Sequence, residues 1–261
     1  MSDPTGARYA LELAYRGTVY AGWQRQPTAR TVEQTVDEAL ALVLNRPIKI
    51  VGCGRTDAGV HASAYLAHFD AAPGALPPGL LPRLNRLLPD DVALYALHRV
   101  PDGFHARFSA VARAYRYRIA RRKDPFRPDA VTVLPRPDRF DRDLLRRAAA
   151  LLPAYSAFAP FCKTNSDAFT MNCELHHAEW TFGAEEWEFR IGANRFLRGM
   201  VRLIVGMCLT VAEGRMSLDE VRAALDEQRP LARPRSAPAA GLYLSAVTYP
   251  DRAGWQLVEE V

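Results

Sequence analysis

The chain has 261 residues, of which 49% are hydrophobic, and it carries a formal net charge of +5. This length and composition are sufficient for one large or two smaller domains with a buried core. No apolar run approaches the roughly 20 residues of a membrane-spanning helix. The N-terminus lacks the charged-then-apolar pattern of a signal peptide, so a cytoplasmic protein is expected. The moderate positive charge permits a polyanionic partner without establishing one.

The four cysteines are scattered along the chain without a CxxC pair, which predicts reduced thiols. Two of them, Cys162 and Cys173, lie near His176 and His177. The spacing of these four residues does not match a common zinc site. The sequence therefore predicts neither a metal site nor a cofactor.

The N-terminal region begins with a predicted half-buried strand, because apolar residues alternate with others from Arg8 to Arg16. The following residues, Gly17 to Arg30, are expected to form a loop, with Tyr20 and Trp23 exposed because they fit no periodic pattern. This loop contains the motif AGWQRQ, and its mixture of an aromatic, amides and a cation suits contact with RNA. A packed Trp23 is the alternative.

A helix is predicted after this loop. Thr31 and Gln34 have the spacing of a capping box, and the pattern is expected to end near Asn45-Arg46-Pro47. One apolar stripe follows helical spacing and consists of Val32, Val36, Leu40 and Val43. The next predicted elements are strands over Ile48–Val51 and Ala64–Phe69, a helix over Pro77–Leu88 and a strand over Val92–Val100. This order indicates an α+β unit of ferredoxin-like type.

The second half opens with a predicted strand from Ala112 to Ala120, in which alternate residues face opposite sides. Tyr115, Tyr117 and Ile119 share one side of this strand. The region from 107 to 127 holds eight basic residues and one acidic residue, Asp124. Aromatic residues interleaved with the basic ones favour nucleic-acid binding, whereas an ordinary solvated face is the alternative.

The rest of the second half is predicted to contain helices, one hairpin and a final strand. A long helix over Asn194–Glu213 is expected to carry Arg195, Arg198 and Arg202 together on one face. The segment Ala154–Asn172 is irregular and receives no role. The other predicted elements are helices Asp141–Leu152 and Ser217–Glu227, hairpin strands Glu174–Phe182 and Trp187–Ala193, a connector Arg229–Ala240 and a strand Leu242–Tyr249.

One stretch between the second and third predicted strands carries the chemistry: Gly52 to Ala62 reads GCGRTDAGVHA. Glycine tolerates unusual backbone angles and lets a ligand approach closely. Arg55 and Asp57 are two residues apart, so in an extended backbone they project to the same side, where the cation keeps the carboxylate ionised. Such an Asp can act as a nucleophile or a base. His61 is interpreted as holding the loop, with general-base catalysis as the alternative.

The nonapeptide GRTDAGVHA resembles the signature loop of the TruA family of pseudouridine synthases. Five further motifs resemble the same family in the same order and span nearly the whole chain. They are AGWQRQ, FHARFSA, AYRYRI, MVRLIVG and GLYL.

The resemblance implies a fold and an activity. The fold would be α+β, with two related ferredoxin-like halves, residues 1–108 and 109–261, whose mainly antiparallel sheets join around a central RNA-binding cleft. The activity would be isomerisation of uridine to pseudouridine at positions 38, 39 and 40 of the tRNA anticodon arm, without metal or organic cofactor, by a homodimer.

The resemblance also implies roles for individual residues. Asp57 would be the catalytic carboxylate, attacking C1′ or removing a proton from C2′, and Tyr115 would stack on the uracil. Arg55 would orient Asp57 and contact a phosphate. Leu244 would line the pocket or simply pack in the core, and Arg202 would support the site electrostatically. The predicted RNA-binding residues are Arg116, Arg118, Arg121, Arg122, Lys123, Arg195 and Arg198.

Two other functional classes share these features. A hydrolase of the N-glycosidic bond would use an Asp and a stacking aromatic but would release free base. A non-catalytic RNA-binding protein would use the same basic strands and would tolerate loss of Asp57.

Overall fold

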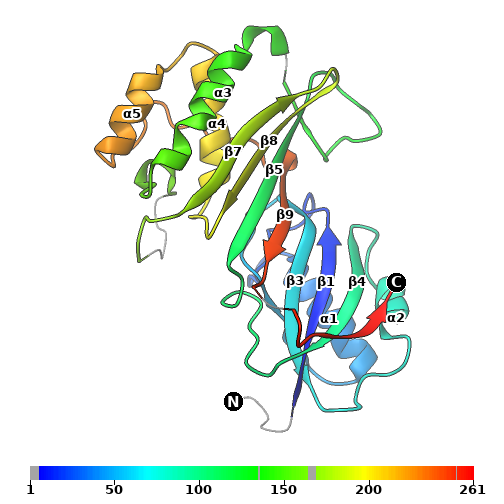
Figure 1. Ribbon diagram of the computed structural model, residues 1–261. Coiled ribbons are helices and arrows are strands. Elements are labelled where there is room, and N and C mark those ends of the chain that lie inside the picture. The colour runs from blue at the N-terminus through cyan, green and yellow to red at the C-terminus, as the bar shows by residue number, and fades with distance from the viewer. Residues whose placement is uncertain (1–5, 135, 164–168, 251) are drawn as a thin grey trace. The chain divides into compact units, whose positions relative to one another are not determined.

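The computed structural model describes residues 6–134, 136–163, 169–250 and 252–261 (Figure 1). These residues form two compact units. Unit 1 contains the described residues up to Val111 together with those from Leu244 onward, and unit 2 runs from Ala112 to Tyr243. The C-terminal segment thus belongs to unit 1, whereas the halves expected from the sequence place it with the second half.

Unit 1 is built on a sheet with the strand order β10-β4-β1-β3-β9, and β2 pairs with β3. The pairs β1–β3, β1–β4, β4–β10 and β2–β3 are antiparallel. Tyr9, Leu11 and Leu13 of β1 are buried, as the alternation predicts. The strands are β1 (Ala7–Tyr15), β2 (Val51–Gly52), β3 (His61–Ala71), β4 (Val92–Val100), β9 (Leu242–Thr248, whose first two residues belong to unit 2) and β10 (Gln256–Glu260).

Two helices, α1 (Val32–Leu44) and α2 (Leu80–Leu87), complete unit 1 and lie on the same face of its sheet in Figure 1. Thr31 caps α1 by accepting a hydrogen bond from the Gln34 backbone N–H, which confirms the predicted start. The Gln34 side chain donates to Glu38 Oε1 at 2.7 Å. Asn45 caps the C-terminus of α1 and adopts a left-handed conformation with φ of 50°.

Two sequence predictions for unit 1 need correction, and one strand has no predicted counterpart. The strand over Ile48–Val51 is reduced to β2, because the Ile50 N–H donates to the Asp37 side chain (2.8 Å) instead of to a neighbouring strand. α2 begins at Leu80, not Pro77. β10 was not predicted, since its sequence QLVEE is short and mostly exposed; it is held by pairing with β4.

Unit 2 contains an antiparallel ladder in which β8 lies between β5 and β7, and β6 runs parallel to β5. The strands are β5 (Ala112–Ala120), β6 (Thr132–Val133), β7 (Leu175–Phe182) and β8 (Glu186–Ala193), and the helices are α3 (Arg142–Ala150), α4 (Met200–Ala212) and α5 (Leu218–Asp226). Short 3-10 helices occupy Pro137–Arg139 (η1), Leu152–Ala154 (η2), Ala159–Phe161 (η3) and Ala239–Gly241 (η4). Of the irregular segment predicted over Ala154–Asn172, residues 164–168 lie outside the described residues.

The helix predicted over Asn194–Glu213 is shorter than expected. α4 begins at Met200, directly after Gly199, whose φ of 71° interrupts any helix. Every residue of α4 except Arg202 is buried. Arg195 and Arg198 therefore lie outside the helix, and the predicted helical face that they share with Arg202 does not exist.

Both units combine helices with mainly antiparallel strands, so the predicted α+β class is confirmed. The RNA-binding cleft between the two halves stays a prediction. None of the helices in the described part of the chain has the length and apolar character that a membrane span requires.

Candidate active site

The loop from Cys53 to Val60 connects β2 to β3 in unit 1 and carries Asp57. At its start the Cys53 N–H donates to Leu66 O of β3 at 2.8 Å. At its end the Val60 N–H donates to the Asp57 carbonyl at 3.1 Å, closing a turn in which Gly59 has φ of 76°. A side chain at residue 59 would be strained at this angle. The backbone on both sides of Asp57 is thus held in place.

An aromatic cluster supports the start of the loop. Trp23 stacks on Tyr65 with ring centroids 4.0 Å apart, and both rings contact Tyr15. The Tyr15 hydroxyl and Thr56 Oγ1 are 2.8 Å apart and share a hydrogen bond, which ties the residue before Asp57 to β1. A Cβ at Gly52 would lie 2.1 Å from the Tyr65 hydroxyl, so only glycine fits there. The cluster therefore packs rigidly beneath the start of the Asp57 loop.

This packing corrects the expectation for the 17–30 loop. Tyr20 and Trp23 are each only 2% exposed, so the packed alternative for Trp23 is confirmed and its proposed contact with RNA is wrong. The loop instead supports the Asp57 loop from the side. The Trp23 N–H donates to Thr56 O at 3.4 Å, and the Gly59 N–H donates to Tyr20 O at 3.2 Å.

His61 connects the two loops. It is fully buried, and its Nδ1 accepts a hydrogen bond from the Gly17 N–H at 3.0 Å. Gly17 is itself packed so closely that a Cβ there would lie 2.0 Å from Val60 O. The interpretation that His61 holds the loop is therefore confirmed.

The two chemically active residues of the loop differ in exposure. Asp57 is half-buried and Arg55 is exposed, and both lie outside β2 and β3. The projection of their side chains to the same side stays a prediction. A half-buried carboxylate on a rigid loop remains accessible to a ligand while its backbone is fixed.

Two further candidate residues lie in β9 and in α4. Leu244 is 2% exposed, and its carbonyl lies 3.5 Å from Ser63 Oγ of β3, which donates to it. This burial suits both the pocket and the packing interpretation. In unit 2, Arg202 of α4 donates through Nε to Ala237 O at 2.7 Å, and the Ala237 N–H donates to Arg202 O at 2.9 Å. Arg202 thus attaches the connector before β9 to α4.

Tyr115 lies in the middle of β5, opposite Ile191 of β8, and is half-buried. The ring of Phe196 meets it edge-on, with centroids 5.1 Å apart and planes at 89°. Such an edge-to-face contact orients an aromatic ring. The sequence pattern placed Phe196 within the predicted helix over Asn194–Glu213. Gly199, which directly precedes α4, is the local signal in the sequence that could have placed Phe196 outside the helix.

The basic run around β5 is less positive in the structure than in the sequence. The antiparallel register places the β7–β8 turn beside the end of β5, where Ala120 pairs with Glu186. Arg118 binds Glu186 in bidentate fashion, at 2.6 and 2.9 Å. Arg122 Nε lies 2.8 Å from Glu185 Oε2, and Arg121 donates to Ala184 O at 2.7 Å. Contacts of Arg116, Arg118, Arg121, Arg122, Lys123, Arg195 and Arg198 with RNA stay predictions.

The described residues contain no group of three or more His, Cys, Asp or Glu side chains that could hold a metal ion. Cys53, Cys173 and Cys208 are buried free thiols, and Cys162 is a half-buried one. Burial raises the pKa of Cys208 to about 12, which keeps this thiol protonated at neutral pH.

Comparison with known proteins gives consistent matches. A family model described as tRNA pseudouridine synthase matches residues 154–250. The chain is 44% identical over 175 residues to tRNA pseudouridine synthase A of Parabacteroides distasonis, a match that covers 67% of this chain and 69% of that protein. It is 44% identical over 176 residues to the protein of the same name from Porphyromonas gingivalis, with the same coverage. For that of Corynebacterium glutamicum the identity is 38% over 186 residues, covering 66% and 63%.

Proposed function

The chain belongs to the tRNA pseudouridine synthase A family, and we propose on this premise that it modifies uridines 38, 39 and 40 of the tRNA anticodon arm. Its activity class follows from the family, since it is an isomerase that converts uridine in tRNA to pseudouridine. The observation that supports the proposed chemistry is Asp57 itself, a half-buried carboxylate on a loop whose backbone is fixed from both ends.

The reaction is an isomerisation whose atoms balance without a co-reactant. The bond between uracil N1 and ribose C1′ breaks, the uracil turns, and C5 bonds to C1′. The C5 proton is lost and N1 gains a proton, so the mass of the nucleotide is unchanged. The detached base has to be held in a pocket during the turn, which requires a flipped-out nucleotide.

Asp57 is assigned the step at the sugar. Its carboxylate either attacks C1′ as a nucleophile or removes a proton from C2′ as a base. Deuterium at C2′ of the target uridine distinguishes the two routes, because only proton removal from C2′ breaks that bond. A large primary isotope effect on single-turnover rates supports the base route, and an effect near one supports attack at C1′.

Tyr115 is assigned the contact with the uracil base. Its ring is held edge-on by Phe196, which suits a stacking platform for uracil, and its hydroxyl is assigned a part in removal of the C5 proton. Arg55 is assigned to a phosphate of the flipped nucleotide and to Asp57, because a planar, permanently charged guanidinium suits both contacts.

Release of tritium from [5-³H]uridine in transcribed tRNA tests the proposal. An isomerase releases tritium to water and leaves the base attached to the RNA. Free uracil in the product would instead indicate a hydrolase, and tight tRNA binding without either product would indicate a non-catalytic RNA-binding protein. Mapping the product by sequence position tests the assignment to positions 38, 39 and 40.

A homodimer in the cytoplasm completes the proposal. A two-fold pair would combine the tRNA-binding surfaces of two subunits on one substrate. Light scattering at the assay concentration measures the mass directly. A fully active monomer of 29.1 kDa would contradict the dimer.

A further inference from the structure

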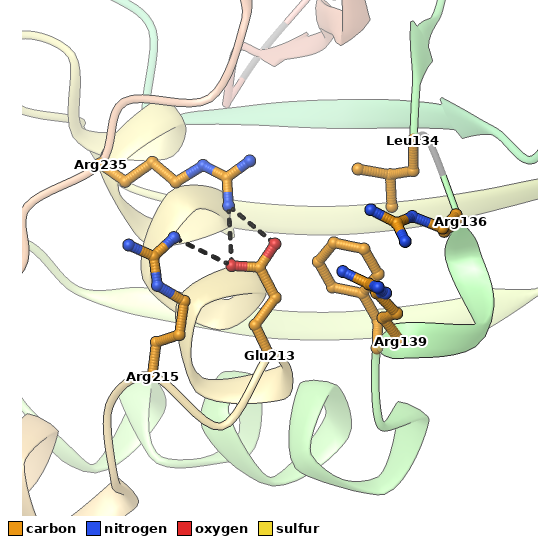
Figure 2. A pocket seen from close by; sticks show the side chains of 7 residues that line it. Leu134, Arg136, Arg139, Glu213, Arg215 and Arg235 are labelled. Atoms are coloured by element: carbon orange, nitrogen blue, oxygen red, sulfur yellow. Dashed lines mark hydrogen bonds and ion pairs between the residues drawn. The ribbon is translucent and has the colours of Figure 1, made fainter.

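Unit 2 contains a cavity of about 380 Å³ that the reaction above does not use (Figure 2). Leu134 and Phe140 provide its apolar wall. The remaining lining residues are charged: Arg136, Arg139, Glu213, Arg215 and Arg235. Four guanidiniums against one carboxylate leave a formal excess of three positive charges around a single cavity. This concentration of charge indicates an anionic ligand.

Three separate segments bring these arginines together. Arg136 immediately precedes η1 and Arg139 ends it. Glu213 caps the C-terminus of α4, and Arg215 follows it across Gly214, which has φ of 68°. Arg235 comes from the connector before β9. Since the segments are far apart in sequence, only the tertiary structure creates the cluster.

The arginines fall into two groups. Arg235 and Arg215 lie 3.3 and 3.5 Å from the carboxylate of Glu213, so these two are neutralised in part and attach the end of α4 to the connector. Arg136 and Arg139 extend over the cavity from η1 in Figure 2, with no ion pair drawn to them. No described carboxylate lies within ion-pair distance of either guanidinium. Asp138, between them in sequence, is 3.8 Å from Arg121 instead.

The backbone of Arg136 provides an independent observation. Its φ of 64° and ψ of 69° are left-handed, a conformation that is strained for a residue with a side chain. Strained backbone of this kind is concentrated at ligand-binding positions. Here the strain aims a second guanidinium into a cavity that is already positive.

We propose that this cavity binds a phosphate group of the tRNA backbone, an inference that rests on the proposed function. A guanidinium matches phosphate geometry with two parallel hydrogen bonds and remains charged at any physiological pH. Arg136, Arg139 and Arg215 are exposed, so the cavity is open enough for a phosphate that is part of a polymer. Arg136 and Arg139 would hold the phosphate, while Glu213 keeps Arg215 and Arg235 in place.

The test compares two double variants that each remove two positive charges from unit 2. Arg136→Gln with Arg139→Gln empties the cavity of its unpaired arginines. Arg147→Gln with Arg222→Gln is the control, because both arginines are exposed and already face a helical Asp, at 3.8 and 2.5 Å. Binding of transcribed tRNA is measured between 50 and 300 mM KCl, with circular dichroism as the check on folding.

The cavity variant is expected to bind tRNA about tenfold more weakly at low salt, and its plot of log K against log salt is expected to be flatter by about one unit. The control should keep the wild-type slope. Equal slopes in both double variants would overturn the proposal. Inorganic phosphate, titrated at constant ionic strength into the wild-type protein and the cavity variant, distinguishes free phosphate from RNA phosphate as the ligand. If the cavity variant loses binding of inorganic phosphate but keeps the wild-type salt slope for tRNA, the ligand is a free phosphate and the assignment to RNA is wrong.

The tritium assay on the wild-type protein is run in parallel. If tRNA binding depends on the cavity arginines but no tritium is released, the proposed reaction fails and the phosphate site stands. If tritium is released and the slopes are equal, the reaction stands and the phosphate site is rejected.

Discussion

Replacing Gly22 by alanine is expected to displace the catalytic loop without changing any residue of that loop. Gly22 has φ of 91°, and a Cβ there would lie 2.2 Å from Thr56 O and 3.2 Å from the Asp57 carbonyl carbon. Carbon and oxygen atoms that are not bonded rarely approach closer than about 3.2 Å. The backbone at residues 56 and 57 therefore has to move by about 1 Å.

The magnitude follows from this displacement. A shift of about 1 Å in a catalytic group can lower a rate by about 100-fold, which corresponds to about 2.7 kcal/mol of activation free energy. The left-handed φ adds a cost to folding of about 1–2 kcal/mol. We expect Gly22→Ala to reduce kcat for tritium release by about 100-fold while the dissociation constant for tRNA changes little, because phosphate contacts dominate affinity.

Gly74→Ala is the matched control. Gly74 has a similar φ of 74°, but nothing lies within 4 Å of a Cβ built there. This variant should lose only the stability that the left-handed φ costs and should keep its kcat. If Gly22→Ala does not fold, Tyr15→Phe removes the 2.8 Å hydrogen bond to Thr56 Oγ1 and makes a milder test. A folded Gly22→Ala protein with a kcat equal to that of Gly74→Ala would show that the Asp57 loop does not depend on the close packing at Gly22.

Three further predictions concern single side chains. Asp57→Asn and Asp57→Ala should each lose turnover by several orders of magnitude and still bind tRNA; tritium release near the wild-type rate from folded Asp57→Ala would contradict the catalytic role. Tyr115→Phe should keep stacking, so its rate reports on the hydroxyl alone, whereas Tyr115→Ala should lose stacking as well, and a wild-type rate there would remove Tyr115 from the pocket. Burial raises the pKa of Asp37 to about 6 although the Ile50 N–H donates to it, so its favourable contribution to stability is present below about pH 4 and is lost as the pH rises to 6. Asp37→Asn keeps the hydrogen-bond acceptor without the charge. Between pH 4 and 7 the unfolding free energy of the variant should therefore rise relative to that of the wild type by up to about 3 kcal/mol. A difference in unfolding free energy that does not change with pH in urea titrations would contradict the shifted pKa.

Local sequence was sufficient for elements whose pattern and boundaries depend on nearby residues. β5 was predicted with its observed bounds, because alternation along a strand needs no knowledge of its neighbours. The starts of α1 and α5 were equally predictable, since Thr31 and Ser217 accept hydrogen bonds from backbone groups three residues away. The motif GRTDAGVHA identified the family and the candidate carboxylate in the same way.

Long-range contacts decided what the local patterns could not. Trp23 has no periodic signal, and its burial comes from stacking on Tyr65, 42 positions away in the printed sequence. β10 forms only because β4 offers a free edge to it. The helix expected from Asn194 starts at Met200, because Gly199 is left-handed, and this moves Phe196 against Tyr115.

Charge shows the same division between sequence and structure. The sequence alone determined that the chain is basic and that cations are concentrated between residues 107 and 127. Only the pairing of β5 with β8 decided that Glu186 neutralises Arg118, and only the packing of η1 beside the end of α4 decided that Arg136 and Arg139 share a cavity. The physical reason is distance. Electrostatic interactions depend on separation in space, which the chain sets by folding and the linear order of residues does not contain.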